Sequence, residues 1–283
     1  MKFVTFSHRS GGDHHAGVLD GDTVACLTEA GIAKSVLEIV QGGGAFLDKV
    51  RAGLAKAPRH ALSDVKLQAP VRPGKVLCSG INYKGHALEN PNAKMPTEPF
   101  FFAKLPSSVV GPDTPVEKTD RTSQMDYEVE FSAVIGKRLF KAKEAEVMPA
   151  IFGYTLLNDI SARDVQFKDN QITIGKNLAG YAPIGPCIVT SDELTRPDNV
   201  ALKARLNGRT LQDGNTSDWL FPLPQLISFL SGFMPLEPGD IVTTGTPAGV
   251  GVFQNPQIFM KAGDVVEIEA EGIGVLRTPI VAG

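Results

Sequence analysis

The 283-residue sequence has few cysteines, few aromatic residues and only a slight excess of acidic over basic residues. Its 3 cysteines, Cys26, Cys78 and Cys187, are widely spaced and flanked by apolar residues. This spacing fits neither a disulfide framework nor a zinc motif, so we expect buried thiols that behave as small apolar side chains. The formal net charge of −3 and the lack of any lysine and arginine cluster disfavour nucleic-acid binding, which depends on attraction to phosphates.

No segment of the sequence resembles a signal peptide or a membrane span. The N-terminus turns polar at Ser7-His8-Arg9 after a short apolar run, unlike a secretory leader. The run from Trp219 to Leu236 carries no charge, but prolines and polar residues interrupt it, and a spanning helix needs about 20 mostly apolar residues. We therefore expect a buried helix there, no membrane partner and a cytoplasmic location.

The chain is long enough for a large domain with a smaller one beside it, at roughly 100–200 residues per domain. Strand-like runs at 2–6 and 23–27 precede a helical pattern over 37–54, which three consecutive glycines interrupt. These runs predict a small N-terminal domain over residues 1–70. A turn-rich stretch over 69–74 then leads into a larger domain over residues 71–283.

The larger domain is dominated by short runs rich in Val, Ile, Leu, Phe and Tyr, which predict strands. They cover 76–78, 100–103, 127–135, 154–157, 184–189, 201–206, 241–244, 265–270 and 275–281. Asn207-Gly208 predicts a tight hairpin turn, whereas helical patterns are few and lie after Asn82, near 142–151 and over 223–230. Strands and helices do not alternate regularly, which disfavours a doubly wound parallel sheet and predicts an α+β fold rich in β-structure.

The segment from Asp126 to Ile135 alternates apolar and polar residues as a strand does. This alternation places Glu128 and Glu130 side by side on one face, about 6.6 Å apart along the strand. The pair indicates either a solvated face or a site that holds a cation. Asp159, at the end of an apolar run, is either the N-cap of a helix or a third carboxylate of that site. Three carboxylates would suit Mg²⁺, Mn²⁺ or Ca²⁺ better than zinc.

Two further groups of polar residues suggest catalytic chemistry. Arg163 and Gln166 are three residues apart on a predicted helical turn, and Lys176 follows. Together they could hold an anionic substrate or a developing oxyanion, although each could equally be an ordinary surface residue. His86 and Glu89 are also three apart, so the carboxylate could orient the imidazole as a general base, although most such pairs are surface contacts.

The remaining histidines and one loop complete the polar features. The proline-rich stretch over 91–99 predicts a surface loop that could close as a lid. The other histidines have no such neighbours in the sequence, so no role is predicted for His8, His14, His15 and His60.

Taken in chain order, these segments resemble the fumarylacetoacetate hydrolase family over roughly residues 72–282. The motifs that carry the resemblance are Gly80-Ile81-Asn82-Tyr83 with His86 and Glu89, Asp126-Tyr127-Glu128-Val129-Glu130, Asp159-Ile160-Ser161-Ala162-Arg163-Asp164-Val165-Gln166, Lys176, and Thr243-Thr244-Gly245-Thr246-Pro247-Ala248-Gly249-Val250-Gly251. The resemblance implies a mixed β-sheet roll or sandwich, a homodimer, and Mg²⁺ or Mn²⁺, with Ca²⁺ as an alternative. The implied metal ligands are Glu128, Glu130 and Asp159.

The resemblance also assigns roles to the remaining polar residues. It implies catalytic roles for His86, Glu89, Lys176, Arg163 and Gln166, and substrate contacts for Tyr83, Thr246 and Lys176. The residues after Lys176 depart from the run with an aspartate and two phenylalanines that many members have, and here read Asn177-Leu178-Ala179-Gly180-Tyr181. This departure should alter the packing around Lys176, and it leaves the identity of the substrate undecided.

The activity that the resemblance implies is hydrolysis of a C–C bond in a small 2,4-dioxo acid, such as an acylpyruvate or fumarylacetoacetate. The metal would polarise the keto acid, His86 would deprotonate a water, and the nearby donors would stabilise the oxyanion. The alternative is a metal-dependent decarboxylase, isomerase or hydratase of 2-keto acids. A non-catalytic metal-binding protein is disfavoured, because such a protein needs no base beside its carboxylates.

Overall fold

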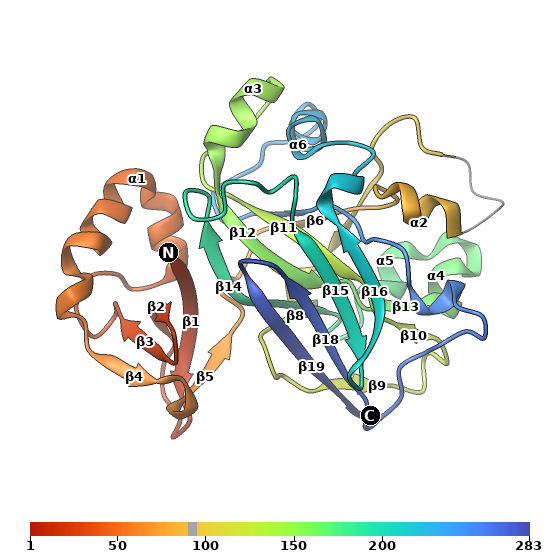
Figure 1. The fold of residues 1–283 in the computed structure, drawn as a ribbon, viewed down its shortest axis with the longest axis horizontal. Coiled ribbons are helices and arrows are strands. Elements are labelled where there is room, and N and C mark those ends of the chain that lie inside the picture. The colour runs from red at the N-terminus through yellow and green to blue at the C-terminus, as the bar shows by residue number, and fades with distance from the viewer. Residues whose placement is uncertain (90–94) are drawn as a thin grey trace.

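The structure, a computed structural model, describes residues 1–89 and 95–283. Figure 1 shows a small lobe, built from the N-terminal residues, beside a larger body rich in β-structure. The lobe consists of β1 (Lys2–His8), β2 (His15–Asp20), β3 (Thr23–Cys26), β4 (Arg59–Ala61), β5 (Val65–Gln68) and helix α1 (Val36–Gly53). The predicted helix is therefore present, and Gly43, with a φ of 58°, places a kink within the run of three glycines.

One sheet passes through both the lobe and the larger body, in the strand order β4-β3-β2-β1-β14-β12-β11-β17-β6-β7. Its strands outside the lobe are β14 (Ala182–Thr190), β12 (Ile151–Asn158), β11 (Val129–Ile135), β17 (Ile241–Thr243), β6 (Val76–Ser79) and β7 (Phe101–Lys104), with β8 (Val109–Val110) beside β14. The two parts are joined by antiparallel pairing of β1 with β14, where Phe3 lies opposite Ile188. The division of the chain near residue 70 stays a prediction.

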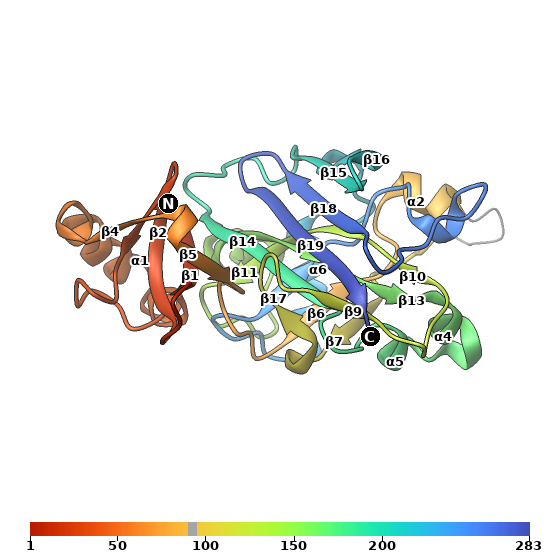
Figure 2. The same cartoon turned by 90° about the horizontal axis from the view of Figure 1, so that it is seen from below.

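A second sheet packs against the part of the first sheet that lies in the larger body (Figures 1 and 2). Its strands are β16 (Arg209–Asn215), β15 (Ala201–Leu206), β18 (Val265–Ala270), β19 (Gly274–Ala282) and β9 (Val116–Lys118), while β10 (Met125–Asp126) and β13 (Ser161–Ala162) form a separate pair. The core between the sheets contains Phe131 and Tyr154 from the first sheet, and Leu202 and Ile268 from the second. The predicted α+β class, rich in β-structure, is confirmed.

The helices of the larger body are short. They are α2 (Lys84–Glu89), α3 (Glu144–Val147), α4 (Arg163–Phe167), α5 (Ile172–Gly175) and α6 (Leu223–Ser231). Single 3-10 turns occupy Leu54–Lys56, Leu62–Asp64, Pro106–Ser108, Met148–Ala150, Lys168–Asn170, Thr216–Asp218 and Gly251–Phe253. Helix α6 lies in the uncharged run and buries Leu226 and Leu230, as predicted. Among the described residues, no helix has the length and apolar character that a membrane crossing requires.

Strand β11 is buried on both faces, which decides one alternative for its carboxylates. Phe131 packs in the core between the sheets, and Val134, from the other face, packs in a second apolar cluster. Glu130 and Ser132 share that other face and are as buried as the apolar residues. The solvated-face interpretation is therefore wrong, because the first sheet is covered on both sides at this strand.

Local signals predicted the turns better than the short helices. Asn207-Gly208 joins β15 to β16, with φ values of 52° and 81°, the left-handed conformations that a two-residue hairpin turn requires. The helical turn predicted for Arg163 and Gln166 is the start of α4, whereas α5 was not predicted, because 4 residues are too few to show a helical period. Residues 91–94 of the predicted lid lie outside the described residues.

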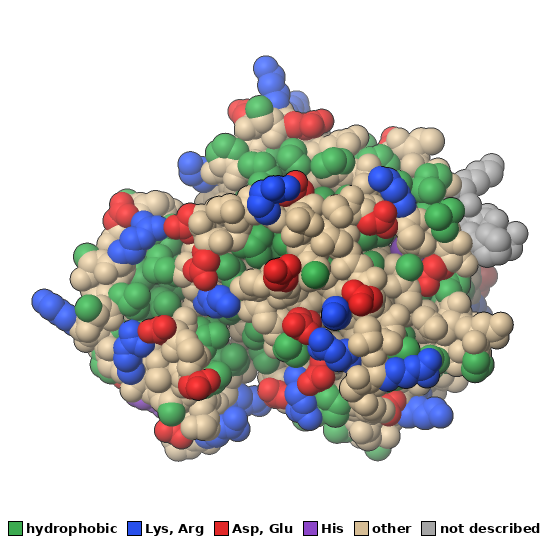
Figure 3. Space-filling model, in the orientation of Figure 1, with side chains coloured by type: hydrophobic (Ala, Val, Ile, Leu, Met, Phe, Trp, Pro, Cys, Tyr) green, Lys and Arg blue, Asp and Glu red, His purple; other side chains and the backbone are tan. Residues whose placement is uncertain are grey.

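The surface carries charges of both signs. On the face drawn in Figure 3, acidic and basic side chains are interspersed. Ion pairs such as Arg59–Asp20, at 2.8 Å, and Arg277–Asp113, at 2.7 Å, join side chains that are largely exposed. Exposed pairs of this kind contribute at most about 1 kcal/mol each. These exposed pairs therefore contribute little to the stability of the fold.

Asn82 ties the segment before α2 to two distant loops, and its removal is expected to destabilise the fold. The buried side-chain amide donates to the carbonyls of Thr244 (3.0 Å) and Phe221 (3.2 Å) and accepts from the Phe221 N–H (2.8 Å). Asn82→Ala would leave these groups unpaired, so urea titration should show a loss of about 2–4 kcal/mol. The exposed control Asn199→Ala should lose less than about 0.5 kcal/mol. Equal losses would contradict this role.

Candidate active site

A cavity of about 480 Å³ opens where the end of β6, the start of β11 and the segments after β12 and β17 meet. The polar side chains on its wall are Ser79, His86, Glu128, Glu130, Arg163, Gln166, Lys176 and Thr246. The apolar ones are Ile81, Phe100, Phe102, Phe167, Ile172 and Phe253. Most of the residues predicted for the site therefore share one cavity.

The antiparallel pairing of β11 with β12 brings the three predicted carboxylates together. Glu130 lies opposite Leu157, so Asp159, just past the end of β12, comes beside Glu128. The Asp159 N–H donates to the Glu128 carbonyl at 3.0 Å. All three side chains are almost completely buried. Asp159 caps no helix, because the next helix, α4, has Ala162 at its N-cap, so the capping interpretation is wrong.

The ammonium group of Lys176, just after α5, joins two of these carboxylates. Its Nζ lies 2.8 Å from Glu128 Oε2 and 2.7 Å from Asp159 Oδ2. Burial alone would lower the pKa of Lys176, but attraction to Asp159 and Glu128 outweighs burial and raises it. Lys176 is therefore charged, and it holds the two carboxylates at a fixed separation.

Arg163, in the first turn of α4, fixes the other oxygen of Glu128. Its Nη2 lies 2.6 Å from Glu128 Oε1, and its Nε lies 2.8 Å from Asp126 Oδ2. Its Nη1 donates to Gln166 Oε1 at 3.2 Å, which confirms the predicted proximity across one helical turn. Burial raises the pKa of Glu128, but Arg163 and Lys176 outweigh burial and hold it well below its usual range.

A second buried lysine, Lys104 at the end of β7, lies behind Asp159. Its Nζ donates to the carbonyls of Tyr181 (2.6 Å), Lys176 (2.7 Å) and Ile160 (3.0 Å). Asp159 Oδ1 lies 2.7 Å from the same Nζ but receives no hydrogen bond, because the three ammonium protons go to the three carbonyls. The contact is therefore an ion pair only. Nothing local in the sequence distinguishes Lys104 from a surface lysine.

The buried carboxylates outnumber the buried cations beside them. The carboxylates are Asp126, Glu128, Glu130 and Asp159, and the cations are Lys104, Arg163 and Lys176. Within the described residues, Glu130 Oε2 and Asp159 Oδ1 receive no hydrogen bond. Burial, with repulsion from Asp159 and Glu128, raises the pKa of Glu130 well above its usual range. A divalent cation between these oxygens would satisfy the acceptors and relieve the repulsion, so the residues fit a metal.

Cys78, on β6, lies beside the same carboxylates. Its Sγ is within 4.8 Å of ligand oxygens of Glu130 and Asp159. Burial, followed by repulsion from those two carboxylates, raises the pKa of the thiol well above its usual value. A neutral thiol is a poor ligand for a hard cation, so an oxygen-preferring ion would leave Cys78 as a neighbour.

His86 and Glu89 meet on α2 as the spacing predicted. His86 Nδ1 lies 2.6 Å from Glu89 Oε2, and Glu89 Oε1 accepts the Gly249 N–H at 2.7 Å. A carboxylate only accepts hydrogen bonds, so Nδ1 carries the proton and Nε2 of the neutral ring is left with its lone pair. His86 lines the cavity, whereas Glu89 lies behind it and contacts the ring and the loop.

The two other predicted substrate contacts differ in position. Thr246 lines the cavity, but its hydroxyl donates to the Val129 carbonyl (2.9 Å) and accepts from Gln212 Nε2 (2.8 Å). Tyr83 has no exposed surface and does not line the cavity. Its carbonyl accepts the Ala87 N–H at 3.0 Å and so helps to form α2, while its contact with a substrate stays a prediction.

Aromatic residues of the cavity wall were not predicted. Phe102 lies beneath Lys176 Nζ, with the ring centroid 5.0 Å away. Phe100, Phe167 and Phe253 come from three separate segments, and no local pattern marks them as neighbours. After Lys176, the Asn177 side chain donates to the carbonyls of Ala103 (3.0 Å) and Thr173 (2.8 Å). This amide holds the segment where the sequence departs from the family's usual run.

Comparisons with known proteins agree with this architecture. A family model described as "Fumarylacetoacetate (FAA) hydrolase C-terminal" matches residues 75–281. Oxaloacetate tautomerase fahd2, mitochondrial, of Xenopus laevis is 40% identical over 249 residues, covering 86% of this chain and 77% of the relative. Oxaloacetate tautomerase FAHD2A, mitochondrial, of Bos taurus is 38% identical over 289 residues, covering 99% and 92%.

Two solved structures cover the whole chain. Fumarylacetoacetate hydrolase from Exiguobacterium antarcticum has a TM-score of 0.88 at 35% identity, with 100% of both chains covered. Maleylpyruvate hydrolase from Sphingobium sp. SYK-6 has a TM-score of 0.85 at 27% identity, also with 100% of both covered. The structural likeness therefore extends over the N-terminal lobe as well as the cavity.

The position of Lys104 predicts a large loss of stability on its removal. Lys104→Met would leave three carbonyls without a donor and remove one cation beside Asp159. Loss of one partner of a buried ion pair costs about 3–5 kcal/mol, and urea unfolding should show a loss of that size. The control Lys137→Met, at an exposed site, should lose less than about 0.5 kcal/mol. Comparable losses would show that the buried ammonium group is dispensable.

Proposed function

Because the chain belongs to the fumarylacetoacetate hydrolase family, we propose that it is a divalent-metal-dependent enzyme that interconverts the keto and enol forms of a small 2-oxo acid of the oxaloacetate type. One observation carries the proposal. The imidazole of His86 lines the same cavity as three donor side chains and Glu128 and Glu130, two carboxylates of a buried cluster that fits a metal. Proton transfer at a carbon beside a carbonyl needs a base, donors for the substrate's charge, and a group that polarises the carbonyl.

Glu128, Glu130 and Asp159 are the residues that would hold the metal. They offer only oxygen atoms, which favours Mg²⁺ or Mn²⁺ over softer ions, with Ca²⁺ as an alternative. When bound, such an ion supplies Lewis-acid polarisation of the substrate's carbonyl and so makes the neighbouring C–H more acidic. Lys176 and Arg163 position Glu128 for this role, because each pairs with one of its two oxygens.

His86 is proposed to move the proton. With Nδ1–H directed to Glu89, the lone pair of Nε2 can accept a proton from C3 of the substrate or from its enol hydroxyl. The ring can then return that proton to the other atom, which completes the tautomerisation without breaking a C–C bond. Glu89 is the positioning residue, because it holds the tautomer of His86 while the Gly249 N–H holds Glu89.

Arg163, Gln166 and Lys176 are proposed to bind the substrate's negative charge. Gln166 Oε1 accepts from Arg163, which leaves the amide NH₂ as the group that can donate. Two of the three Lys176 protons go to Glu128 and Asp159, so one remains. A dicarboxylate would meet cationic and amide donors in the cavity, while the aromatic residues that also line it limit the access of water.

The names of the relatives favour tautomerisation over hydrolysis. Two relatives of 38–40% identity are named oxaloacetate tautomerases, and one of them matches 99% of this chain. Hydrolysis of a C–C bond in a 2,4-dioxo acid remains the second candidate, because the His86–Glu89 pair could equally deprotonate a water. The likeness to a maleylpyruvate hydrolase supports that candidate. The homodimer and the cytoplasmic location stay predictions.

Glu130 provides a test of the metal site. Glu130→Gln keeps the shape of the side chain but removes the charge that no buried cation balances. Mn²⁺ affinity is measured from the EPR signal of free Mn²⁺. It should fall by more than roughly 10–100-fold, which is the loss typical of a residue that only hydrogen-bonds to a metal ligand. The exposed control Glu117→Gln should bind Mn²⁺ like the parent. Unchanged affinity in Glu130→Gln would refute the assignment of the site.

His86 provides a test of the chemistry. With Mg²⁺ or Mn²⁺ present, ketonisation of enol-oxaloacetate is followed by ultraviolet absorbance, and pyruvate release from a panel of acylpyruvates is followed by a coupled assay. The parent should accelerate ketonisation, and His86→Asn should retain Mn²⁺ binding but lose about 10²–10⁴-fold in rate. Pyruvate release without ketonisation would favour the hydrolase, and a parental rate in His86→Asn would refute the role of the base.

A further inference from the structure

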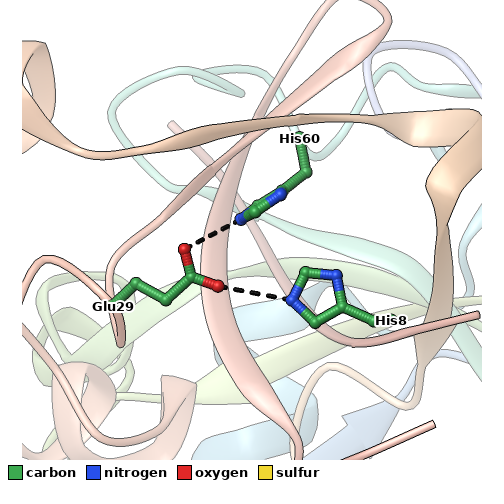
Figure 4. A group of neighbouring side chains, drawn as sticks. All are labelled: His8, Glu29 and His60. Atoms are coloured by element: carbon green, nitrogen blue, oxygen red, sulfur yellow. Dashed lines mark hydrogen bonds and ion pairs between the residues drawn. The ribbon is translucent and has the colours of Figure 1, made fainter. Parts of the chain in front are cut away.

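A second cluster of metal-ligating side chains lies in the N-terminal lobe. Figure 4 shows the rings of His8 and His60 directed at the carboxylate of Glu29. His8 Nε2 lies 3.3 Å from Glu29 Oε1, and His60 Nε2 lies 2.9 Å from Glu29 Oε2. The three ligand atoms lie within 4.8 Å of one another. Neither the proposed activity nor the sequence analysis gives these residues a role.

The cluster is separate from the proposed active site. His8 ends β1, His60 lies in β4, and Glu29 follows β3, all in the lobe at the left of Figure 1. The helices that carry His86 and Arg163 lie at the opposite end of the molecule in that view, and none of the three cluster residues lines the catalytic cavity. A ligand bound in the lobe would therefore not contact the substrate.

The sheet of the lobe holds the rings in place. Phe6 lies two residues before His8 on β1, and it is fully buried. Its ring contacts the His8 ring edge-on, with centroids 5.9 Å apart, and the tilted His60 ring at 6.1 Å. The rings of His8 and His60 are themselves 4.7 Å apart. Both imidazoles thus rest on a buried aromatic ring, which limits their rotation and preorganises the ligand atoms.

The distances suit a transition-metal ion. Ligand atoms about 2.0–2.1 Å from a tetrahedral Zn²⁺ lie about 3.3 Å from one another. The His8–Glu29 separation of 3.3 Å matches this spacing, and the His60–Glu29 separation of 2.9 Å needs only a small movement. Two imidazoles and one carboxylate form a ligand set typical of zinc sites with a water in the fourth position. The harder ions Mg²⁺ and Ca²⁺ prefer oxygen ligands.

Charge and access also favour a cation here. The Glu29 carboxylate, within hydrogen-bond distance of both imidazoles, supplies a negatively charged ligand for a cation. The side chains of His8, Glu29 and His60 are 30%, 31% and 25% exposed, so an ion can reach them from solvent. Without a metal, the N–H groups of His8 and His60 point to the Glu29 carboxylate and fill the position that the ion would take.

A second pair of ligand types flanks the cluster. His15 Nδ1 lies 3.6 Å from Cys26 Sγ, and the Glu29 N–H donates to the same sulfur at 3.4 Å. The His15 ring stacks on Phe6, with centroids 5.5 Å apart, and contacts the His8 ring edge-on at 5.3 Å. This pair adds imidazole and thiol groups beside Glu29, and so increases the preference of the region for soft or borderline ions over Mg²⁺.

We propose that His8, Glu29 and His60 form a binding site for one Zn²⁺-class ion in the N-terminal lobe. The ion would join the end of β1, the turn after β3 and strand β4, which are far apart in the chain. Binding to the folded state alone raises stability, so the site would act as a clamp on the lobe. Its ligand set differs in kind from the carboxylates of the catalytic cavity.

The test is a titration of the full chain with Zn²⁺ in saturating Mg²⁺, which occupies the carboxylate site. A zinc indicator in competition measures affinity and stoichiometry. The parent should bind one Zn²⁺ per chain in the lobe and gain in Tm. In the double variant His8→Ala/His60→Ala, the affinity for Zn²⁺ should fall by more than roughly 10–100-fold, the loss typical of a residue that only hydrogen-bonds to a metal ligand. Zn²⁺ should no longer raise the Tm of this variant. The exposed control His14→Ala should match the parent.

Further variants keep the outcome decisive. If the double variant does not fold, Glu29→Gln and His60→Gln replace it, with the same loss of affinity expected for each. The same titration in Glu130→Gln, where the catalytic site is impaired, should still show the lobe site. Absence of stoichiometric Zn²⁺ binding by the parent, or equal affinity in the parent and the histidine variants, would overturn the proposal.

Discussion

The ammonium group of Lys176, held between Glu128 and Asp159, is the contact on which the arrangement of the cavity depends. Carboxylates buried this close repel one another, and each loses several kcal/mol on leaving water. Lys176 offsets this cost for two of them, and Arg163 adds a second cation to Glu128. Glu130 is left without a cation of its own, so the cluster is one positive charge short. A divalent ion supplies that charge, which is why the arrangement suits a metal enzyme acting on an anionic substrate.

The two sides of the cavity are also joined through one loop. Asp126 accepts hydrogen bonds from the N–H groups of Gly251 (2.8 Å) and Val252 (3.1 Å), as well as from Arg163. Glu89, which orients His86, accepts the Gly249 N–H of the same loop. The proposed base and the residues proposed to bind the substrate's charge are therefore held by neighbouring peptide groups. A shift of this loop would move both, so the geometry of the proposed proton transfer depends on contacts with the loop backbone.

The molecule separates two groups of side chains that could bind a metal. The cavity in the larger body offers carboxylate oxygens that are almost completely buried, and such sites select hard ions. The lobe offers imidazoles around Glu29 that remain partly exposed, and such groups select borderline ions. Strand β1 connects the two regions, since its first residues pair with β14 and its last residue is His8. The strands of the lobe are therefore continuous with the main sheet.

Local sequence was enough to define the strand around Glu130, the turn at Asn207-Gly208 and the contact of His86 with Glu89. Each of these depends on backbone geometry within a few residues. Long-range packing decided the rest. Whether β11 has a solvated face depends on which elements cover it. Lys104 reaches Asp159 only in the folded chain, since β7 and β12 are separated by three strands in the order of the sheet. The histidines of the lobe meet for the same reason, across turns and strand pairings. A local pattern predicts which side chains lie on each face of a strand. It does not predict which strand will pair with it, because pairing depends on the burial of whole faces.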